Sequence, residues 1–240
     1  QGCYEEGITF LNRTLASLHI NGDEHCEAEA LWLLGRAQTE LKQYEAAQQS
    51  LTRALALIRT IGDRDDEFRF LTDLARLHVA RNAPAEAESS AQAALTIAES
   101  LRNNEGVACA LIESARAALL QGDARRAAES AAKLAERAVK TLDHENAQDR
   151  SGECWRAYWA WGQALLALQQ ETAALAALRR AVTLLNELRA QFGVHDKLRY
   201  DQATQNLAQP ARELHAFLLR LNQTNEAAAL AQNWQSIANG

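Results

Sequence analysis

The stretch Leu41-Lys42-Gln43-Tyr44-Glu45-Ala46-Ala47, followed by Leu51 and Ala54, decides the fold because its pattern recurs along the chain. The small residue Ala47 has counterparts at Ala87 and Ala127, so the three alanines stand forty residues apart. Further small or apolar residues follow each of them at +4 and +7, namely Ala91 and Ala94 in the second copy and Ala131 and Leu134 in the third. A small residue followed by spacings of four and three, recurring at a fixed long period, is typical of stacked helical repeats.

The same small position extends in both directions from these three copies. It falls at Gly7 near the start of the chain, and at Ala174 and Ala227 near its end, where the intervals grow to forty-seven and fifty-three residues. We predict a single helical-repeat domain over residues 1–240, with a partial repeat at 1–22, repeats at about 23–62, 63–102, 103–150 and 151–193, and C-terminal capping helices in 194–240. Within it we expect an exposed loop at 143–152 and a long helix from about 197 to 221.

A second small position precedes the first by twelve residues in each repeat, at Gly35, Ala75, Ala115 and Gly162. Two antiparallel helices approach closely only where no bulky side chain intervenes. We therefore expect these residues to lie on the first helix of each hairpin, facing the second. Gly22 and Gly62 suit helix C-termini, and Asp23, Asp63 and Asn103 suit the next helix N-terminus.

The composition supports helices throughout and excludes several classes of function. The 240 residues are 48% hydrophobic with only 2 Pro and 11 Gly, and no segment alternates as a strand does. A net charge of −6 argues against a nucleic-acid-binding surface. The chain has no apolar run long enough to span a membrane and no signal peptide, so we expect a cytoplasmic protein. Methionine is absent even at position 1, which favours a domain trimmed from a longer protein.

The sequence contains no motif that predicts catalysis, a cofactor or a metal site. It has neither a glycine-rich phosphate loop nor an H-E-x-x-H pair, and its four cysteines are scattered without a C-x-x-C pair. His25 and Cys26 adjoin, but adjacent residues on a helix point apart. Asp63, Asp65 and Asp66 crowd one junction, where we expect helix capping instead of cation binding. We predict no catalytic residue, no metal ligand and no cofactor.

The pattern Leu31…Leu34-Gly35…Tyr44…Ala47…Leu51…Ala54 resembles the tetratricopeptide repeat, most clearly between residues 27 and 182. The resemblance implies an all-α, right-handed superhelical solenoid of antiparallel helix pairs, with about eleven helices. The period of forty exceeds the family's value of about 34, and the proline that usually follows the second helix is absent. This longer variant resembles the arms of bacterial signalling proteins and transcription regulators.

The resemblance also implies that the first helix of each repeat lines a concave groove. The residues that follow the small position there are Arg36, Arg76, Arg116 and Gln163, and earlier turns of the same face carry Trp32, Trp159, Arg69 and Arg156. These eight residues are our candidate ligand-binding set. Guanidinium groups pair with carboxylates through two parallel hydrogen bonds, and tryptophan offers a stacking surface. We therefore expect a protein-binding scaffold that recognises an acidic or carboxylate-bearing segment.

The same side chains also suit roles that involve no ligand. The arginines have internal partners within reach at Asp73, Glu113 or Glu40, or are simply solvated, and Trp32 and Trp159 suit packing between hairpins equally well. An alternative function is a sensor or regulatory arm of a signalling ATPase or transcription regulator, binding an effector or an autoinhibitory segment. The groove lacks the Asn and Lys of the family's chaperone-tail clamp. Finally, an apolar stripe on the first segment predicts contact with a preceding region or a second copy, through Ile8, Leu11, Leu15 and Leu18.

Overall fold

The part of the chain that the computed structural model describes forms eleven α-helices. The structure describes residues 2–121, 124–143, 154–190 and 208–234, and these ranges contain no strand. The helices are α1 (Gly2–Asn21), α2 (Glu24–Glu40), α3 (Tyr44–Ile61), α4 (Arg64–Ala80), α5 (Pro84–Ser100), α6 (Asn104–Leu119), α7 (Ala124–Asp143), α8 (Cys154–Ala167), α9 (Glu171–Ala190), α11 (Gln209–Arg220) and α12 (Thr224–Asn233). The predicted all-α solenoid of antiparallel helix pairs is confirmed.

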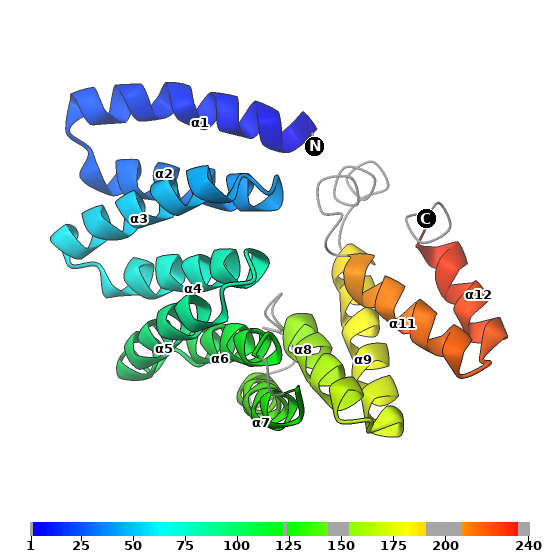
Figure 1. Cartoon of the computed structure of the whole chain (residues 1–240). Helices are drawn as coiled ribbons and strands as arrows, with labels where there is room; N and C mark the ends of the chain where they lie inside the picture. Colours follow the sequence, from blue (N-terminus) through cyan, green and yellow to red (C-terminus); the bar gives the residue numbers. More distant parts are fainter. Residues whose placement is uncertain (1, 122–123, 144–153, 191–207, 235–240) are drawn as a thin grey trace.

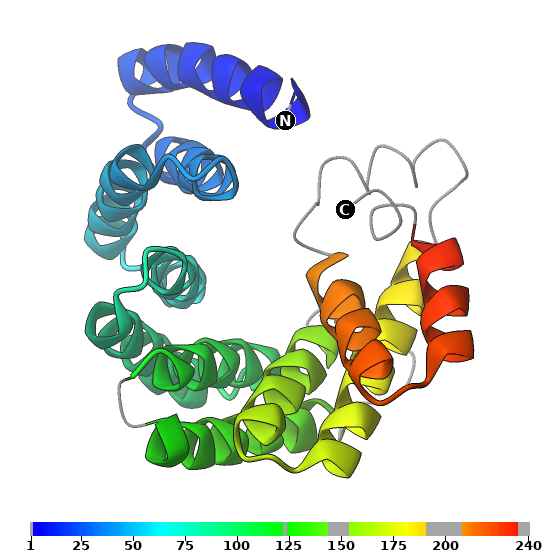
Figure 2. The same ribbon diagram turned by 45° about the vertical axis from the view of Figure 1, so that its right-hand side comes forward.

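The helices stack in chain order into an open arch (Figures 1 and 2). Each helix packs on the next, and α2, α4, α6 and α8 also contact one another in succession. These four helices lie on the inner side of the arch, whereas α3, α5 and α7 lie on its outer side (Figure 2). These first helices of the hairpins therefore form the concave surface, so a binding site on that surface would be built from their inward-facing side chains.

Four hairpin turns among the described residues share one backbone conformation. A residue with positive φ follows the first helix at Lys42, Asn82, Gln169 and Asn222, with φ between 57° and 59°. In each case the next residue donates its backbone N–H to the carbonyl five positions earlier, over 2.8 to 2.9 Å. This bond satisfies one of the carbonyls that a helix end leaves free. The last hairpin, where the interval between small positions is longest, thus closes as the other three described turns do.

The junctions between hairpins use the predicted caps. Gly22 and Gly62 have φ of +71° and +83°, a left-handed conformation that glycine adopts without steric cost. The side chains of Asp23, Asp63 and Asn103 then accept hydrogen bonds from backbone N–H groups in the first turns of α2, α4 and α6. Each such N-cap stabilises its helix by about 1 kcal/mol.

At the small positions, the two helices of a hairpin meet through one of two kinds of residue pair. A Cβ atom built on Gly35 would lie 2.6 Å from Leu51 Cγ, and one on Gly162 would lie 2.8 Å from Leu178 Cγ. In the two middle hairpins the equivalent positions are occupied by Ala75 and Ala115, and the residues sixteen positions later are Ala91 and Ala131, all fully buried. Glycine thus accompanies leucine and alanine accompanies alanine, because the space between the helices is limited.

At both ends of the chain the described residues bear on only part of what the sequence predicts. The apolar stripe Ile8, Leu11, Leu15 and Leu18 on α1 is half-buried, and Leu15 packs against the core, so α2 already covers part of it. Near the other end, the described part of the expected helix at 197–221 is α11, which begins at Gln209; residues 197–207 lie outside the described residues, as does most of the loop expected at 143–152. No helix in the described ranges is long and apolar enough to cross a membrane.

A buried histidine predicts a pH-dependent stability. His78 on α4 is buried, and its Nδ1 atom has no hydrogen-bond partner among the described residues. Burial lowers the pKa of His78 below its usual value of 6.5, and the nearby Arg81 lowers it further, against a smaller opposing effect of Glu86. Below about pH 6.5 the unfolded chain therefore takes up a proton at this side chain that the folded chain resists.

We expect the free energy of unfolding of the wild type to decrease as the pH falls below about 6.5, because the unfolded chain then binds a proton at His78 that the folded chain resists. Above about pH 7.5 the ionisation of His78 should not affect the free energy of unfolding. Thermal melts of the wild type and of His78→Gln, followed by circular dichroism between pH 5 and 8, check this. The wild type should lose more stability than the variant as the pH falls. A difference between the two proteins that is the same at every pH would contradict the prediction.

Candidate functional site

Two adjoining pockets lie on the concave surface, and Arg76 lines both of them. The first has a volume of about 360 Å³ between α2, α4 and α6, and the second one of about 290 Å³ that reaches α8 and α11. Seven of the eight predicted site residues line these pockets: Trp32, Arg36, Arg69 and Arg76 the first, and Arg76, Arg116, Arg156 and Trp159 the second. Gln163 lines neither. The repeat register therefore brings residues from four helices to one surface.

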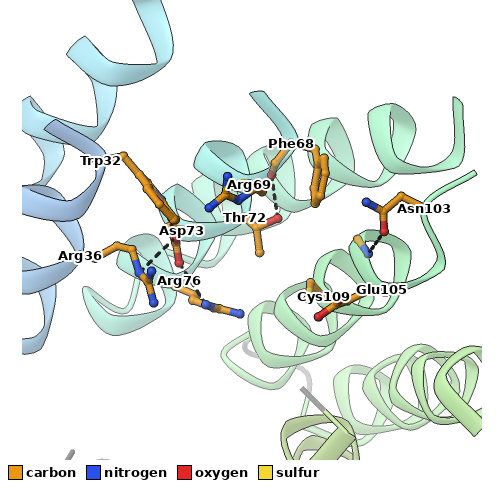
Figure 3. A pocket seen from close by; sticks show the side chains of 11 residues that line it. Trp32, Arg36, Phe68, Arg69, Thr72, Asp73, Arg76, Asn103, Glu105 and Cys109 are labelled. Carbon is orange, nitrogen blue, oxygen red and sulfur yellow. Dashed lines mark hydrogen bonds and ion pairs between the residues drawn. The ribbon is translucent and has the colours of Figure 1, made fainter. Parts of the chain in front are cut away.

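The arginines on this surface form a continuous series of ion pairs with buried carboxylates. Arg36 on α2 lies 3.5 Å from Asp73 on α4, and Arg76 joins Asp73 at 3.0 Å to Glu113 on α6 at 2.9 Å. Arg116 lies 2.9 Å from Glu113, and Arg156 on α8 lies 4.0 Å from it. We call Arg36, Asp73, Arg76, Glu113, Arg116 and Arg156 the arginine–carboxylate ladder; Figure 3 shows its first members. Internal pairing of the arginines, which the sequence allowed but did not require, is thus observed.

Glu113 is the centre of the ladder. Its side chain is 0% exposed and receives hydrogen bonds from Arg76 Nε and Arg116. A carboxylate taken out of water at this depth is costly unless cations and hydrogen bonds compensate it. Asp73 and Glu113 are forty residues apart, as are Arg36 and Arg76. Arg36 on α2 therefore meets Asp73 on α4, and Arg76 on α4 meets Glu113 on α6.

Trp32 contacts aromatic, acidic and cationic side chains of α2 and α4. Trp32 is only 8% exposed, stacks on Phe70 at 5.3 Å between ring centroids, and donates its indole N–H to Asp73 at 2.6 Å. The guanidinium groups of Arg36 and Arg69 lie 4.9 and 4.5 Å from its ring centroid. Such cation–π contacts favour a fixed position for both arginines. Trp32 therefore presents little free surface to a ligand.

The second tryptophan lies in an equivalent arrangement with a different partner. Trp159 on α8 is half-buried and donates its indole N–H to Glu213 on α11 at 2.7 Å. Gln163 donates to the same carboxylate at 3.1 Å, and Arg116 lies 5.8 Å from the Trp159 ring centroid. Trp155, one turn before Trp159 on α8, is buried. Trp159 and Gln163 thus bind a carboxylate of the chain itself.

The pocket linings carry more positive than negative charge. Six cationic side chains line the two pockets, namely Arg36, Lys42, Arg69, Arg76, Arg116 and Arg156, against the three carboxylates Asp73, Glu40 and Glu105. The chain as a whole has a net charge of −6. The repeat register did not point to Lys42 and Tyr44, because they stand at the hairpin turn between α2 and α3, where the helical periodicity is interrupted. The pocket linings therefore hold more cations than carboxylates, although Glu113 and Asp66, which line neither pocket, balance part of this charge.

The comparisons with known proteins agree with this architecture. A family model described as tetratricopeptide repeat matches residues 1–60, and no curated protein matches the chain. Among solved structures, BtubC (BKLC) from P. vanneervenii is 17% identical over 98% of this chain and 91% of its own length, with a TM-score of 0.68. RapI in its apo form is 13% identical over 97% of this chain and 92% of its own length, with a TM-score of 0.63.

A third solved structure is a signal transduction ATPase with numerous domains and a tetratricopeptide repeat sensor, PH0952 from Pyrococcus horikoshii. It is 17% identical over 99% of this chain but only 38% of its own length, with a TM-score of 0.61. At these identities the likeness concerns the fold. Residues 1–60 thus match the tetratricopeptide-repeat family model, and the stacked hairpins of this architecture continue beyond them through the described residues.

Proposed function

We propose that this chain is a protein-interaction scaffold whose concave groove, formed by the two pockets, binds an acidic or carboxylate-bearing segment. The observation that carries the proposal is the excess of cations over carboxylates in the pocket linings of a chain whose net charge is −6. Cationic clefts in a low-dielectric wall attract anionic partners over several ångströms. Two adjoining pockets suit an extended segment better than one small molecule.

The ladder also defines which cations are available to a ligand. Arg76 and Arg116 are about four-fifths and three-quarters buried and pair with the fully buried Glu113, so altering them would disturb the fold. Arg36 has a side chain that is 47% exposed, and Asp73 keeps Trp32 and Arg76 if Arg36 is changed. Lys42 is exposed at the edge of the second pocket. Arg36 and Lys42 therefore test the groove without confounding binding with unfolding.

We expect the double variant Arg36→Gln/Lys42→Asn to bind an acidic peptide about three- to tenfold more weakly, because each exposed charged contact contributes up to about 1 kcal/mol. Asparagine suits position 42 because it tolerates the left-handed conformation found there. The probe is a fluorescein-labelled peptide of alternating glutamate and alanine, measured by fluorescence anisotropy at fixed salt. A peptide with glutamine in place of glutamate separates charge recognition from non-specific binding.

The matched control is Arg125→Gln on α7, because Arg125 is 88% exposed and lines neither pocket. Arg125→Gln should leave peptide affinity unchanged. The proposal fails if the wild type does not prefer the glutamate peptide, or if Arg125→Gln weakens binding as much as the groove variant does. Circular dichroism melts of all three proteins show whether each is folded at the assay temperature.

A second candidate is a regulatory arm that holds an effector or an autoinhibitory segment in the same groove. The alignment of 99% of this chain with part of the PH0952 structure, whose repeats are described as a sensor, favours it. Under this alternative we expect the gene to encode a nucleotide-binding domain beside the repeats. Sequencing of the flanking coding region distinguishes the two.

A further inference from the structure

A histidine and three carboxylates meet between α2 and α4. Ligand atoms of His25, Glu29 and Asp66 all lie within 4.8 Å of one another. His25 and Glu29 are four residues apart on α2, a spacing that places both side chains on one face of the helix. Asp66 comes from the first turn of α4, and Asp63, the N-cap of that helix, lies beside it. We call these four residues the His25 cluster.

The distances within the cluster suit a small divalent cation. His25 Nε2 lies 3.4 Å from Asp66 Oδ2 and 3.7 Å from Asp63 Oδ2. Zinc bonds of about 2.0–2.2 Å to nitrogen and oxygen place neighbouring ligand atoms of a tetrahedral site about 3.4 Å apart. One imidazole with carboxylates favours zinc or a similar transition metal over calcium or magnesium, which prefer oxygen ligands alone.

The two aspartates are also oriented as metal ligands are. Asp66 Oδ1 receives a hydrogen bond from Arg69, and its other oxygen faces His25. Asp63 Oδ1 accepts the backbone N–H of Asp66 at 3.0 Å, while its Oδ2 faces the same imidazole. Ligating carboxylates in metal sites are commonly held in this way by hydrogen bonds to the oxygen that does not bind the metal.

We propose that His25, Glu29 and Asp66 bind a zinc-class divalent cation, with Asp63 Oδ2 beside the site at 3.7 Å from His25 Nε2. The cluster holds three carboxylates, and Arg69 pairs with one of them, Asp66, so a divalent cation would compensate negative charge that this arginine does not balance. The competing arrangement is an ion pair between protonated His25 and the two aspartates. The metal site would connect the inner helices of two consecutive repeats, because His25 and Glu29 belong to α2 and the aspartates to the start of α4.

The test is a titration of the full chain with zinc chloride alone, by isothermal calorimetry, together with thermal melts in zinc and in chelator. We expect the wild type to bind zinc and to melt at a higher temperature in its presence, because a ligand that binds only the folded state stabilises that state. His25→Ala should weaken zinc binding by at least about tenfold, since loss of an outer-shell partner alone typically costs that much. Glu29→Gln, a change at a half-buried position, should also weaken it.

The matched control is Cys26→Ser, because Cys26 is an exposed thiol adjacent to His25 on the same helix. It should bind zinc as the wild type does. The proposal is overturned if the wild type does not bind zinc, if His25→Ala and Glu29→Gln bind it as tightly as the wild type, or if Cys26→Ser abolishes binding and so reveals a thiol site. If His25→Ala does not fold, Glu29→Gln and Cys26→Ser decide between the two kinds of ligand. Failure here leaves the peptide-binding proposal untouched, because the cluster lines neither pocket.

Discussion

Replacing Glu113 by alanine should destabilise the protein by about 3 kcal/mol, because it removes the buried carboxylate shared by Arg76, Arg116 and Arg156. Breaking a buried pair leaves cations without their counter-charge, and partial exposure of the arginines keeps the loss near the lower end of the usual range. Urea unfolding followed by circular dichroism measures this loss. Glu113→Gln, which keeps the shape and one acceptor, should lose less.

The control for this prediction is Glu99→Ala on α5. Glu99 pairs with Arg137 on α7 at 2.7 Å, but its side chain is 48% exposed. An exposed pair of this kind contributes less than about 1 kcal/mol. If Glu113→Ala and Glu99→Ala lower the free energy of unfolding equally, then burial does not increase the stabilisation that an ion pair provides. The conclusion that the buried Glu113 pairs stabilise the stack more than exposed pairs do would then be wrong.

Gly35→Ala should destabilise the protein by roughly 1–3 kcal/mol, although alanine favours a helix over glycine by about 1 kcal/mol. The added Cβ atom would lie 2.6 Å from Leu51 Cγ, and its nearest backbone neighbour is the Ala47 carbonyl oxygen at 3.3 Å. Leu51→Ala alone should cost about 2–5 kcal/mol, because Leu51 is almost fully buried. Equilibrium urea unfolding of both single variants and the double variant measures the coupling.

The double variant reproduces the alanine pairs of the two middle hairpins, so its loss should be smaller than the sum of the two single losses by about 1 kcal/mol. This follows because the added methyl group occupies space that the leucine vacates. Additive losses would show that the two positions do not compete for the same space. A stabilising Gly35→Ala would show that helix propensity outweighs the contact.

The repeat period predicted the scaffold because it records a local steric requirement. Ala47, Ala87 and Ala127 are buried where the two helices of a hairpin meet, and a bulky residue there would separate them. The caps at Asp63 and Asn103 were predictable because capping depends on residues within one turn. The left-handed turn residues Lys42 and Gln169 were not, because neither is a glycine and a backbone hydrogen bond decides their conformation.

The concave surface was predictable in its residues but not in its partners. Register placed Arg36, Arg76 and Arg116 on one face, and the structure finds them lining adjoining pockets. The sequence left open whether they faced a ligand, a carboxylate of the chain or solvent, because that depends on how far each inner helix is displaced along the next. The pairing of Trp159 and Gln163 with Glu213, fifty or more residues away, is a result of this packing.

The amino-acid sequence by itself determined the helices, their hairpin pairing and the face on which the arginines stand, because these depend on spacings of three, four and forty residues. Only the tertiary structure decided which carboxylate on the next inner helix each arginine meets, how deeply Glu113 is buried and that His25 lies beside Asp66. These contacts join residues thirty-seven or more positions apart, so which of the possible partners meet depends on how the helices pack. That packing also determines how much of the positive charge of the arginines on the concave surface is balanced by carboxylates of the chain.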